Sequence, residues 1–186
     1  YTFEDLADDA IQVLNAYRVD KAHIVGMSMG GIITQIVALK HPDRVLTISL
    51  VMTSNYDSSL PKKDSKVTEV FAKININNWE DKEEVIKYVM DRSKVLVGTK
   101  HPFNEEKIRK LAGKDFDRAS NMESMENHEY VKGWGLYLSR THEINVPTLV
   151  IHGTDDPIIP HEHGAHLSKI ISNAVQQRAS DIHFDP

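Results

Sequence analysis

The chain has 186 residues, the length of one ordinary domain, and 40% of them are apolar. This composition favours a folded domain and excludes a chain that is disordered throughout. A net charge of -5 gives no basic surface for nucleic acid or for an anionic membrane. Because the chain has no cysteine, disulfides, thiolate zinc sites and a cysteine nucleophile are excluded. We expect a cytoplasmic protein that has neither nucleic acid nor a membrane as a partner.

The first part of the chain predicts a helix, a strand and a second helix. Apolar residues recur at helical spacing over residues 3–17, and Thr2 with Asp5 forms a candidate capping pair at the start. Ala22–Val25 is a short apolar run followed by glycine, which indicates a buried strand. Ile32–Lys40 is apolar almost all round, which predicts a helix buried on more than one side.

A second strand and a long polar segment follow. His41-Pro42-Asp43 ends the helix, and Val45–Met52 is apolar on both faces, as in a strand of a parallel sheet. Residues 55–142 are polar and charged with helical periodicity, which indicates a helical insertion. The candidate helices in this insertion are 64–74, 80–97, 104–112 and 122–139.

The last part of the chain returns to strand and helix. Residues 146–152 predict a strand, a loop rich in Gly, Asp and Pro follows, and residues 161–171 predict a helix. Residues 175–186 hold few apolar side chains and match no element.

This order of elements indicates the fold class. Strands that alternate with helices predict an α/β fold with a mostly parallel sheet, flanking helices and a helical cap insertion. We therefore divide the chain into residues 1–54, the first part of the core; 55–142, the cap insertion; and 143–186, the second part of the core.

The sequence Gly26-Met27-Ser28-Met29-Gly30 is a G-x-S-x-G motif between a predicted strand and a predicted buried helix. A nucleophile lifted above a sheet needs a very tight strand-to-helix turn, and the glycines keep Cβ atoms out of that turn. The alternatives are a glycine-rich turn with a capping serine, or a phosphate loop. The chain holds no G-x-x-x-x-G-K-[ST] and no G-x-G-x-x-G sequence, which leaves the phosphate loop without its motif.

The sequence resembles the α/β-hydrolase superfamily, and within it the esterase-like members that carry a GxSMGG elbow and a helical cap. The aclacinomycin methylesterase-like and haloperoxidase-like groups are examples. The text that carries the resemblance covers residues 1–54 and 146–174. It implies a serine hydrolase that needs no cofactor, acts on a small-molecule substrate such as a carboxylic ester, and uses a catalytic triad.

The resemblance also implies which residues do the chemistry. Ser28 would be the nucleophile, and the backbone N–H of Met29 would be half of the oxyanion hole. The acid would be Asp156, the third residue after Gly153 in the loop that follows the strand 146–152. Asp155 is the alternative acid, and the alternative role for either aspartate is only to cap the following turn.

The base of such a triad is a histidine that follows the acid in the chain. His161, His163 and His166 lie too close to Asp156 to come in on a separate loop, so we assign the base to His183. The text before His183 departs from the family pattern, since neither a convincing strand nor a glycine precedes it. A loose terminal histidine is the alternative.

Other features of the sequence leave alternatives open. A metal site at His161, His163 and His166 beside two aspartates is the alternative we weigh, but the spacing is not H-E-x-x-H. A solvated helix with several histidines explains them better, so we expect no metal site. Trp134 and Tyr137, on the predicted helix 122–139, would either line an apolar pocket or pack the cap.

The function has alternatives as well. The first alternative is a relative of the same fold that does not hydrolyse, such as a lyase or a ligand-binding protein. The second is an inactive fragment, since the chain lacks the family's N-terminal strands and the second oxyanion donor that they carry. We expect the chain to be a truncated piece for that reason.

Overall fold

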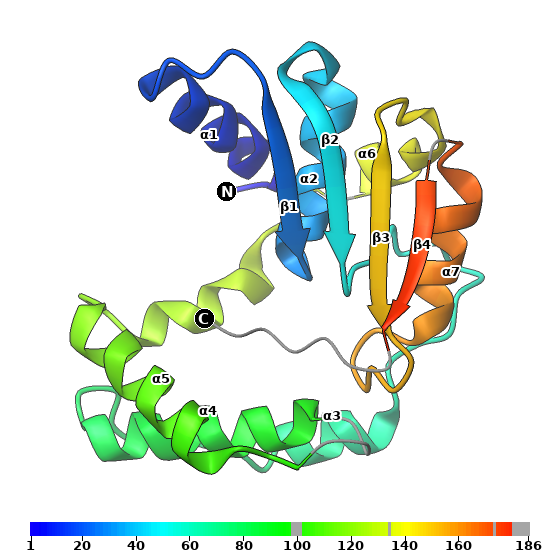
Figure 1. Cartoon of the computed structure of the whole chain (residues 1–186). Coiled ribbons are helices and arrows are strands. Elements are labelled where there is room, and N and C mark those ends of the chain that lie inside the picture. The colour runs from blue at the N-terminus through cyan, green and yellow to red at the C-terminus, as the bar shows by residue number, and fades with distance from the viewer. Residues whose placement is uncertain (98–101, 134, 173, 180–186) are drawn as a thin grey trace. The chain divides into compact units, whose positions relative to one another are not determined.

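The computed structural model describes residues 1–97, 102–133, 135–172 and 174–179. His183, the predicted base, and Trp134 lie outside the described residues. Strands and helices alternate at both ends of the chain, around a helical middle (Figure 1). The elements are α1 (Phe3–Ala16), β1 (Ala22–Met27), α2 (Met29–Lys40), β2 (Val45–Val51), α3 (Ser65–Phe71), α4 (Lys82–Leu96), α5 (Glu105–Arg118), α6 (Gly135–Leu138), β3 (Thr148–Gly153), α7 (His161–Ile170) and β4 (Ala174–Ala179), with 3₁₀ helices at Pro42–Arg44, Glu123–Tyr130 and Thr141–Glu143.

The four strands form one parallel sheet in the order β1-β2-β3-β4, which confirms the predicted α/β class. Met27 at the end of β1 pairs with Val51, and Val51 pairs with Ile151 of β3. The carboxyl ends of β1, β2 and β3 therefore meet at one edge of the sheet, where α/β folds place their sites.

One strand was missed by the sequence analysis. Residues 175–186 matched no element, yet β4 covers 174–179 and pairs with β3 along its whole length. The pairing uses backbone groups, so a segment with few apolar residues can still complete the sheet. A strand thus does precede His183, contrary to the expectation.

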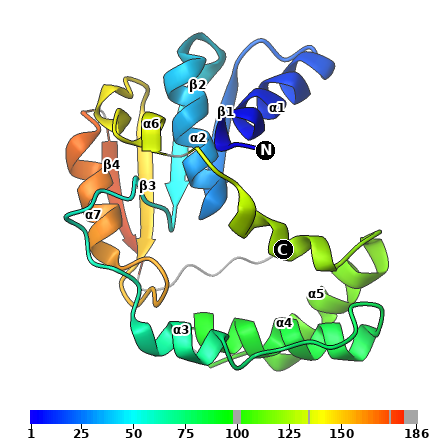
Figure 2. The ribbon, with the colours of Figure 1, turned by 180° about the vertical axis from the view of Figure 1, so that it is seen from behind.

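Helices α2, α6 and α7 lie on one face of the sheet (Figures 1 and 2). Helix α2 is buried almost all round, as its sequence predicted: Ile36, Val37 and Gln35 have no exposed surface. The predicted capping pair is also confirmed, because Thr2 and Asp5 form a reciprocal capping box at the start of α1.

Strand β1 is less buried than its sequence predicted. Residues alternate along it, and Val25 and Met27 are 71% and 51% exposed. Their side chains share one face of the strand because strand residues alternate between faces. In the described part of the unit that holds the sheet, helices α2, α6 and α7 lie on the opposite face (Figures 1 and 2), which explains the exposure.

The single helix predicted over residues 122–139 is wrong. A 3₁₀ helix at Glu123–Tyr130 and the short α6 replace it. Between them Gly133 adopts a φ of +87°, which a right-handed helix cannot contain. The backbone carbonyl of Lys132 instead accepts a hydrogen bond from the N–H of Phe3, so the chain is extended there.

The chain divides into two compact units, residues 1–62 with 131–186, and residues 63–130. In the second unit, α4 packs on α5, and Asp81 caps α4 by accepting the N–H groups of Glu83 and Glu84. Tyr88 of α4 is buried against the ring of Trp79 at 5.2 Å. The division at residues 54 and 142 and the cap role of the insertion remain predictions.

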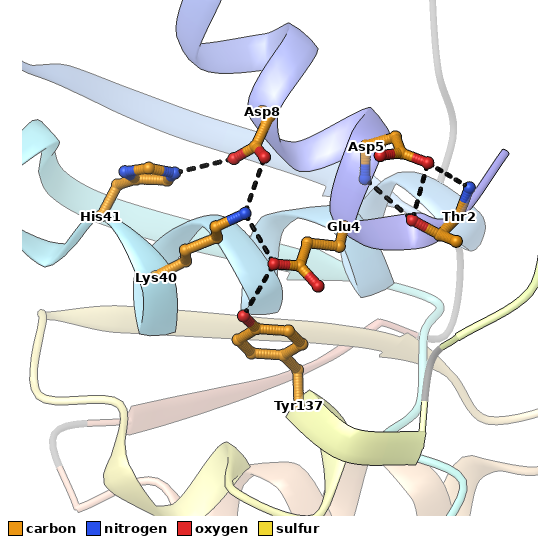
Figure 3. Close-up of polar contacts among 7 residues, drawn as sticks. All are labelled: Thr2, Glu4, Asp5, Asp8, Lys40, His41 and Tyr137. Atoms are coloured by element: carbon orange, nitrogen blue, oxygen red, sulfur yellow. Dashed lines mark hydrogen bonds and ion pairs between the residues drawn. The ribbon is translucent and has the colours of Figure 1, made fainter.

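An ion-pair cluster joins α1, α2 and α6 in the first unit (Figure 3). The Lys40 ammonium donates to Glu4 at 2.7 Å and to Asp8 at 2.6 Å. His41 contacts the other oxygen of Asp8, and the hydroxyl of Tyr137 donates to Glu4 at 3.1 Å. The Lys40 hydrogen bonds lower the pKa of both carboxyls, and those carboxylates raise the pKa of Lys40. Tyr137 therefore anchors α6 to α1.

Replacing Lys40 with methionine should lower the melting temperature at neutral pH. The carboxyls have depressed pKa values in the folded protein, so their contribution is present above their unfolded values of about 4 and lost as the pH falls further. The gap in melting temperature between the native protein and Lys40→Met should therefore close in acid. Thermal melts at pH 7 and pH 3 measure it, and a gap that stays constant contradicts the ion-pair origin.

Candidate active site

Ser28 lies at the turn between β1 and α2, at the carboxyl edge of the sheet. Its backbone has φ 51° and ψ -117°, a conformation that residues with a side chain rarely adopt. Such strain costs about 1–3 kcal/mol and persists only where the surroundings enforce it. The residue is exposed, and its side chain makes no capping hydrogen bond to α2. Ser28 therefore does not act as a side-chain cap of this helix, which was the alternative from the sequence.

Backbone hydrogen bonds enforce this strained turn. The N–H of Ser28 donates to Val51 of β2 at 2.9 Å, and its carbonyl accepts from the N–H of Gly31 at 2.9 Å. The hydroxyl of Thr53, which is 1% exposed, donates to the same carbonyl at 2.7 Å. Ser28 is thus fixed on both sides of its backbone while the residue itself is exposed.

The glycines of the motif do not contribute equally. A Cβ atom on Gly26 would lie 2.2 Å from the carbonyl oxygen of Gly30, so glycine is required there. A Cβ atom on Gly30 would meet nothing within 4 Å outside its own helix, contrary to the expectation that both flanking positions must be free of side chains. The second close approach is at Gly31, where a Cβ would lie 2.5 Å from Thr53.

Replacing Gly26 with alanine should lower the free energy of unfolding by about 3 kcal/mol, because a backbone carbonyl cannot move away cheaply. Gly30→Ala is the matched control: it should leave stability unchanged or raise it by up to about 1 kcal/mol through helix propensity. Urea unfolding of the two variants measures both. Equal losses in the two would contradict this account of the turn.

Asp156 lies on the loop after β3, at the same edge of the sheet. Its Oδ1 accepts the backbone N–H groups of Ile158 and Ile159, each at 2.9 Å. Its Oδ2 lies 3.5 Å from Nε2 of His152, and only 9% of its side chain is exposed. The predicted capping alternative is therefore seen at one oxygen, while the second oxygen is not used by the turn.

The pKa of the Asp156 carboxyl is below its ordinary value. Burial raises it, but the His152 side chain and the N–H groups of Ile159 and Ile158 together lower it by more. The carboxylate is therefore ionised at neutral pH, as an acid that orients an imidazole must be. Asp155, the alternative acid, is exposed.

The histidines after Asp156 occupy different surroundings. His163 is buried and bonded at both nitrogens: Nδ1 lies 2.6 Å from the Ser54 hydroxyl, and Nε2 lies 2.8 Å from the Pro61 carbonyl. The ring of His161 packs edge-on to that of His152 at 6.2 Å. His163 ties α7 to the loop after β2, and it could serve as a base only by breaking both contacts.

His166 and His142 line a pocket of about 650 Å³ with the loop at residues 55–58. Neither Ser28 nor Asp156 contributes to its wall.

In the described part of the chain, no three His, Asp or Glu side chains gather in a way that could hold a metal ion. Nor does any described helix have the length and apolar character needed to cross a bilayer.

Two residues near the turns were not identified from the sequence: Thr53, which holds the Ser28 carbonyl, and His152, which contacts the Asp156 loop. Each stands at or just after the carboxyl end of a strand, which is the one signal that could have found it.

The sequence matches the alpha/beta hydrolase fold family over residues 1–185. The chain belongs to this family. The described sheet and its strand-to-helix turn at Ser28 agree with that assignment, and they confirm the predicted resemblance and fold class.

Several known proteins are similar to this α/β-hydrolase chain. Rhodomycin D methylesterase DnrP of Streptomyces peucetius is 27% identical and covers 94% of the chain, and the uncharacterized hydrolase YugF of Bacillus subtilis is 29% identical over the same share. The chain spans 64% and 63% of the lengths of these two proteins. The structure of Est816, described as an N-acyl homoserine lactone degrading enzyme, aligns with a TM-score of 0.68 at 22% identity; the alignment covers 96% of this chain and 66% of that one, and it supports the fold alone.

Proposed function

We propose that this protein is a serine hydrolase that cleaves carboxylic esters through an acyl-enzyme on Ser28. The observation that carries the proposal is the exposed residue Ser28 on a strained turn whose backbone is fixed on both sides. The ionised Asp156 on the loop after β3, two strands away at the same edge, supports it.

The reaction begins when Ser28 Oγ attacks the ester carbonyl and its proton passes to the base, which we assign to His183. Asp156 orients the imidazole and stabilises the cation that forms. The oxyanion is bound by the N–H of Met29, the first residue of α2, where helix N–H groups have no partner within the helix. The imidazolium then protonates the leaving alcohol, and water attacks the acyl group to restore Ser28.

Carboxylic esters are the proposed substrate class because two relatives are named as methylesterases of rhodomycin D. Methyl esters are therefore the first natural-type substrates to assay, beside the chromogenic p-nitrophenyl acetate. Both require the same steps at Ser28, and p-nitrophenolate is a much better leaving group than methanol.

A fluorophosphonate probe tests the proposal directly. The probe should label one serine, and mass spectrometry of the digested protein should place the adduct on Ser28. Folded protein that binds a methyl ester without hydrolysis and without labelling would favour the ligand-binding alternative. Labelling at another serine would move the nucleophile and contradict the proposal.

A further inference from the structure

His152 is a buried histidine whose ring reaches the loop that carries Asp156. It is the next-to-last residue of β3, and none of its surface is exposed. Its Nε2 lies 2.8 Å from the carbonyl oxygen of Ile159. A carbonyl can only accept a hydrogen bond, so Nε2 carries the proton. Within the described residues, Nδ1 is buried without a hydrogen-bond partner.

The His152 imidazole and the Asp156 carboxylate both form hydrogen bonds with the backbone of Ile159. Ile159 gives its N–H to Oδ1 of Asp156 and accepts the Nε2–H of His152 at its carbonyl. The imidazole therefore fixes the far end of the turn that begins at Asp156. The same Nε2 lies 3.5 Å from Oδ2, so the positive end of the N–H dipole is near the oxygen that the turn leaves unused.

The ring itself has little freedom to move. Helix α7 packs directly on it at Gly164, where a Cβ atom would lie 2.6 Å from Cβ and 2.7 Å from Nδ1 of His152. A buried side chain pressed by a helix backbone keeps one rotamer. His152 can therefore hold the loop that carries Asp156 in one position.

We propose that His152 is a positioning residue that sets the orientation of the Asp156 carboxylate through its contact with Ile159. The proposal rests on the proposed hydrolase function, in which Asp156 orients the catalytic base. A displaced carboxylate would weaken the reaction step and not substrate binding, because a shift of about 1 Å in a catalytic group costs about 100-fold in rate.

Two amide variants separate positioning from packing. In His152→Gln the side-chain nitrogen reaches as far as Nε2 and can donate to Ile159. In His152→Asn the nitrogen reaches only as far as Nδ1. We expect the asparagine variant to lose about 10- to 100-fold in kcat for p-nitrophenyl acetate with KM nearly unchanged. The glutamine variant should recover most of that loss.

Melting by circular dichroism shows whether each variant folds, and His152→Met replaces the asparagine variant if that one does not. Methionine fills a similar buried volume without a donor, so it should lose kcat in the same way. Equal kcat in the glutamine variant and in the asparagine or methionine variant would overturn the proposal, since a packing role does not depend on a donor that reaches Ile159.

A double-mutant cycle tests whether His152 acts through Asp156. In an Asp156→Asn background, replacing His152 with asparagine should cause no further fall in kcat, because the acid is already lost. Losses that multiply would overturn the proposal. If Asp156→Asn alone keeps full kcat, the proposed triad is wrong; if it loses kcat and His152→Asn does not, only the role of His152 is wrong.

Discussion

Replacing Ser28 with alanine should lower kcat for p-nitrophenyl acetate by about 10⁴- to 10⁶-fold and abolish labelling by a fluorophosphonate. The proposed acyl-enzyme cannot form without the hydroxyl. The remaining rate would come from substrate binding and the oxyanion donor alone. Initial rates at saturating substrate, divided by the concentration of folded protein, measure the effect.

The same change should leave folding intact. The Ser28 side chain is exposed and makes no capping bond to α2, so alanine removes no buried contact. Alanine is also as strained as serine at a φ of 51°, so the backbone cost does not change. The melting temperature should therefore match that of the native protein, which separates a chemical loss from unfolding.

An exposed serine elsewhere in the same unit provides the control. Ser58→Ala removes a hydroxyl from the loop after β2 and should keep both kcat and labelling. Turnover that survives in Ser28→Ala would contradict the serine mechanism, whatever the control shows.

The turn at Ser28 could be predicted because its requirement is local. A strand that runs into a helix through G-x-S-x-G leaves few backbone solutions, and the structure has the predicted turn. The unequal roles of the glycines could not be predicted, because they depend on which atoms approach each one in the folded turn. The Gly30 carbonyl and Thr34 lie against Gly26, Thr53 lies against Gly31, and nothing in the described residues lies against Gly30. Strand β4 was missed because it is recognised by its backbone pairing with β3, which a segment with few apolar residues does not reveal in its sequence.

The loop that holds Asp156 shows the same limit. The sequence predicted a loop there and left open two roles for Asp156, the acid of a triad and a cap of the turn. The structure shows that capping engages one oxygen and that His152 lies near the other. Whether one or both oxygens of a carboxylate accept hydrogen bonds from a turn depends on distances that the fold sets. No spacing in the sequence reveals it.

Replacing Asp156 with asparagine should lower kcat by about 10⁴-fold. The amide oxygen can still accept the N–H groups of Ile158 and Ile159, so the turn should persist. The amide nitrogen then occupies the place of Oδ2. It carries no negative charge and can only donate, so it would hold the imidazole of the base in the wrong tautomer. Steady-state kinetics with p-nitrophenyl acetate measure the loss.

Asp155→Asn is the matched control, because the neighbouring carboxylate is exposed and was the alternative acid from the sequence. It should keep kcat. The stability of Asp156→Asn gives a second check, because folding lowers the pKa of Asp156. The native protein should be more stable than the variant above the unfolded-state pKa of about 3.9, and this difference should be lost as the pH falls below that value. A large kcat loss in Asp155→Asn with none in Asp156→Asn would transfer the acid to residue 155 and leave the buried carboxylate a purely structural cap.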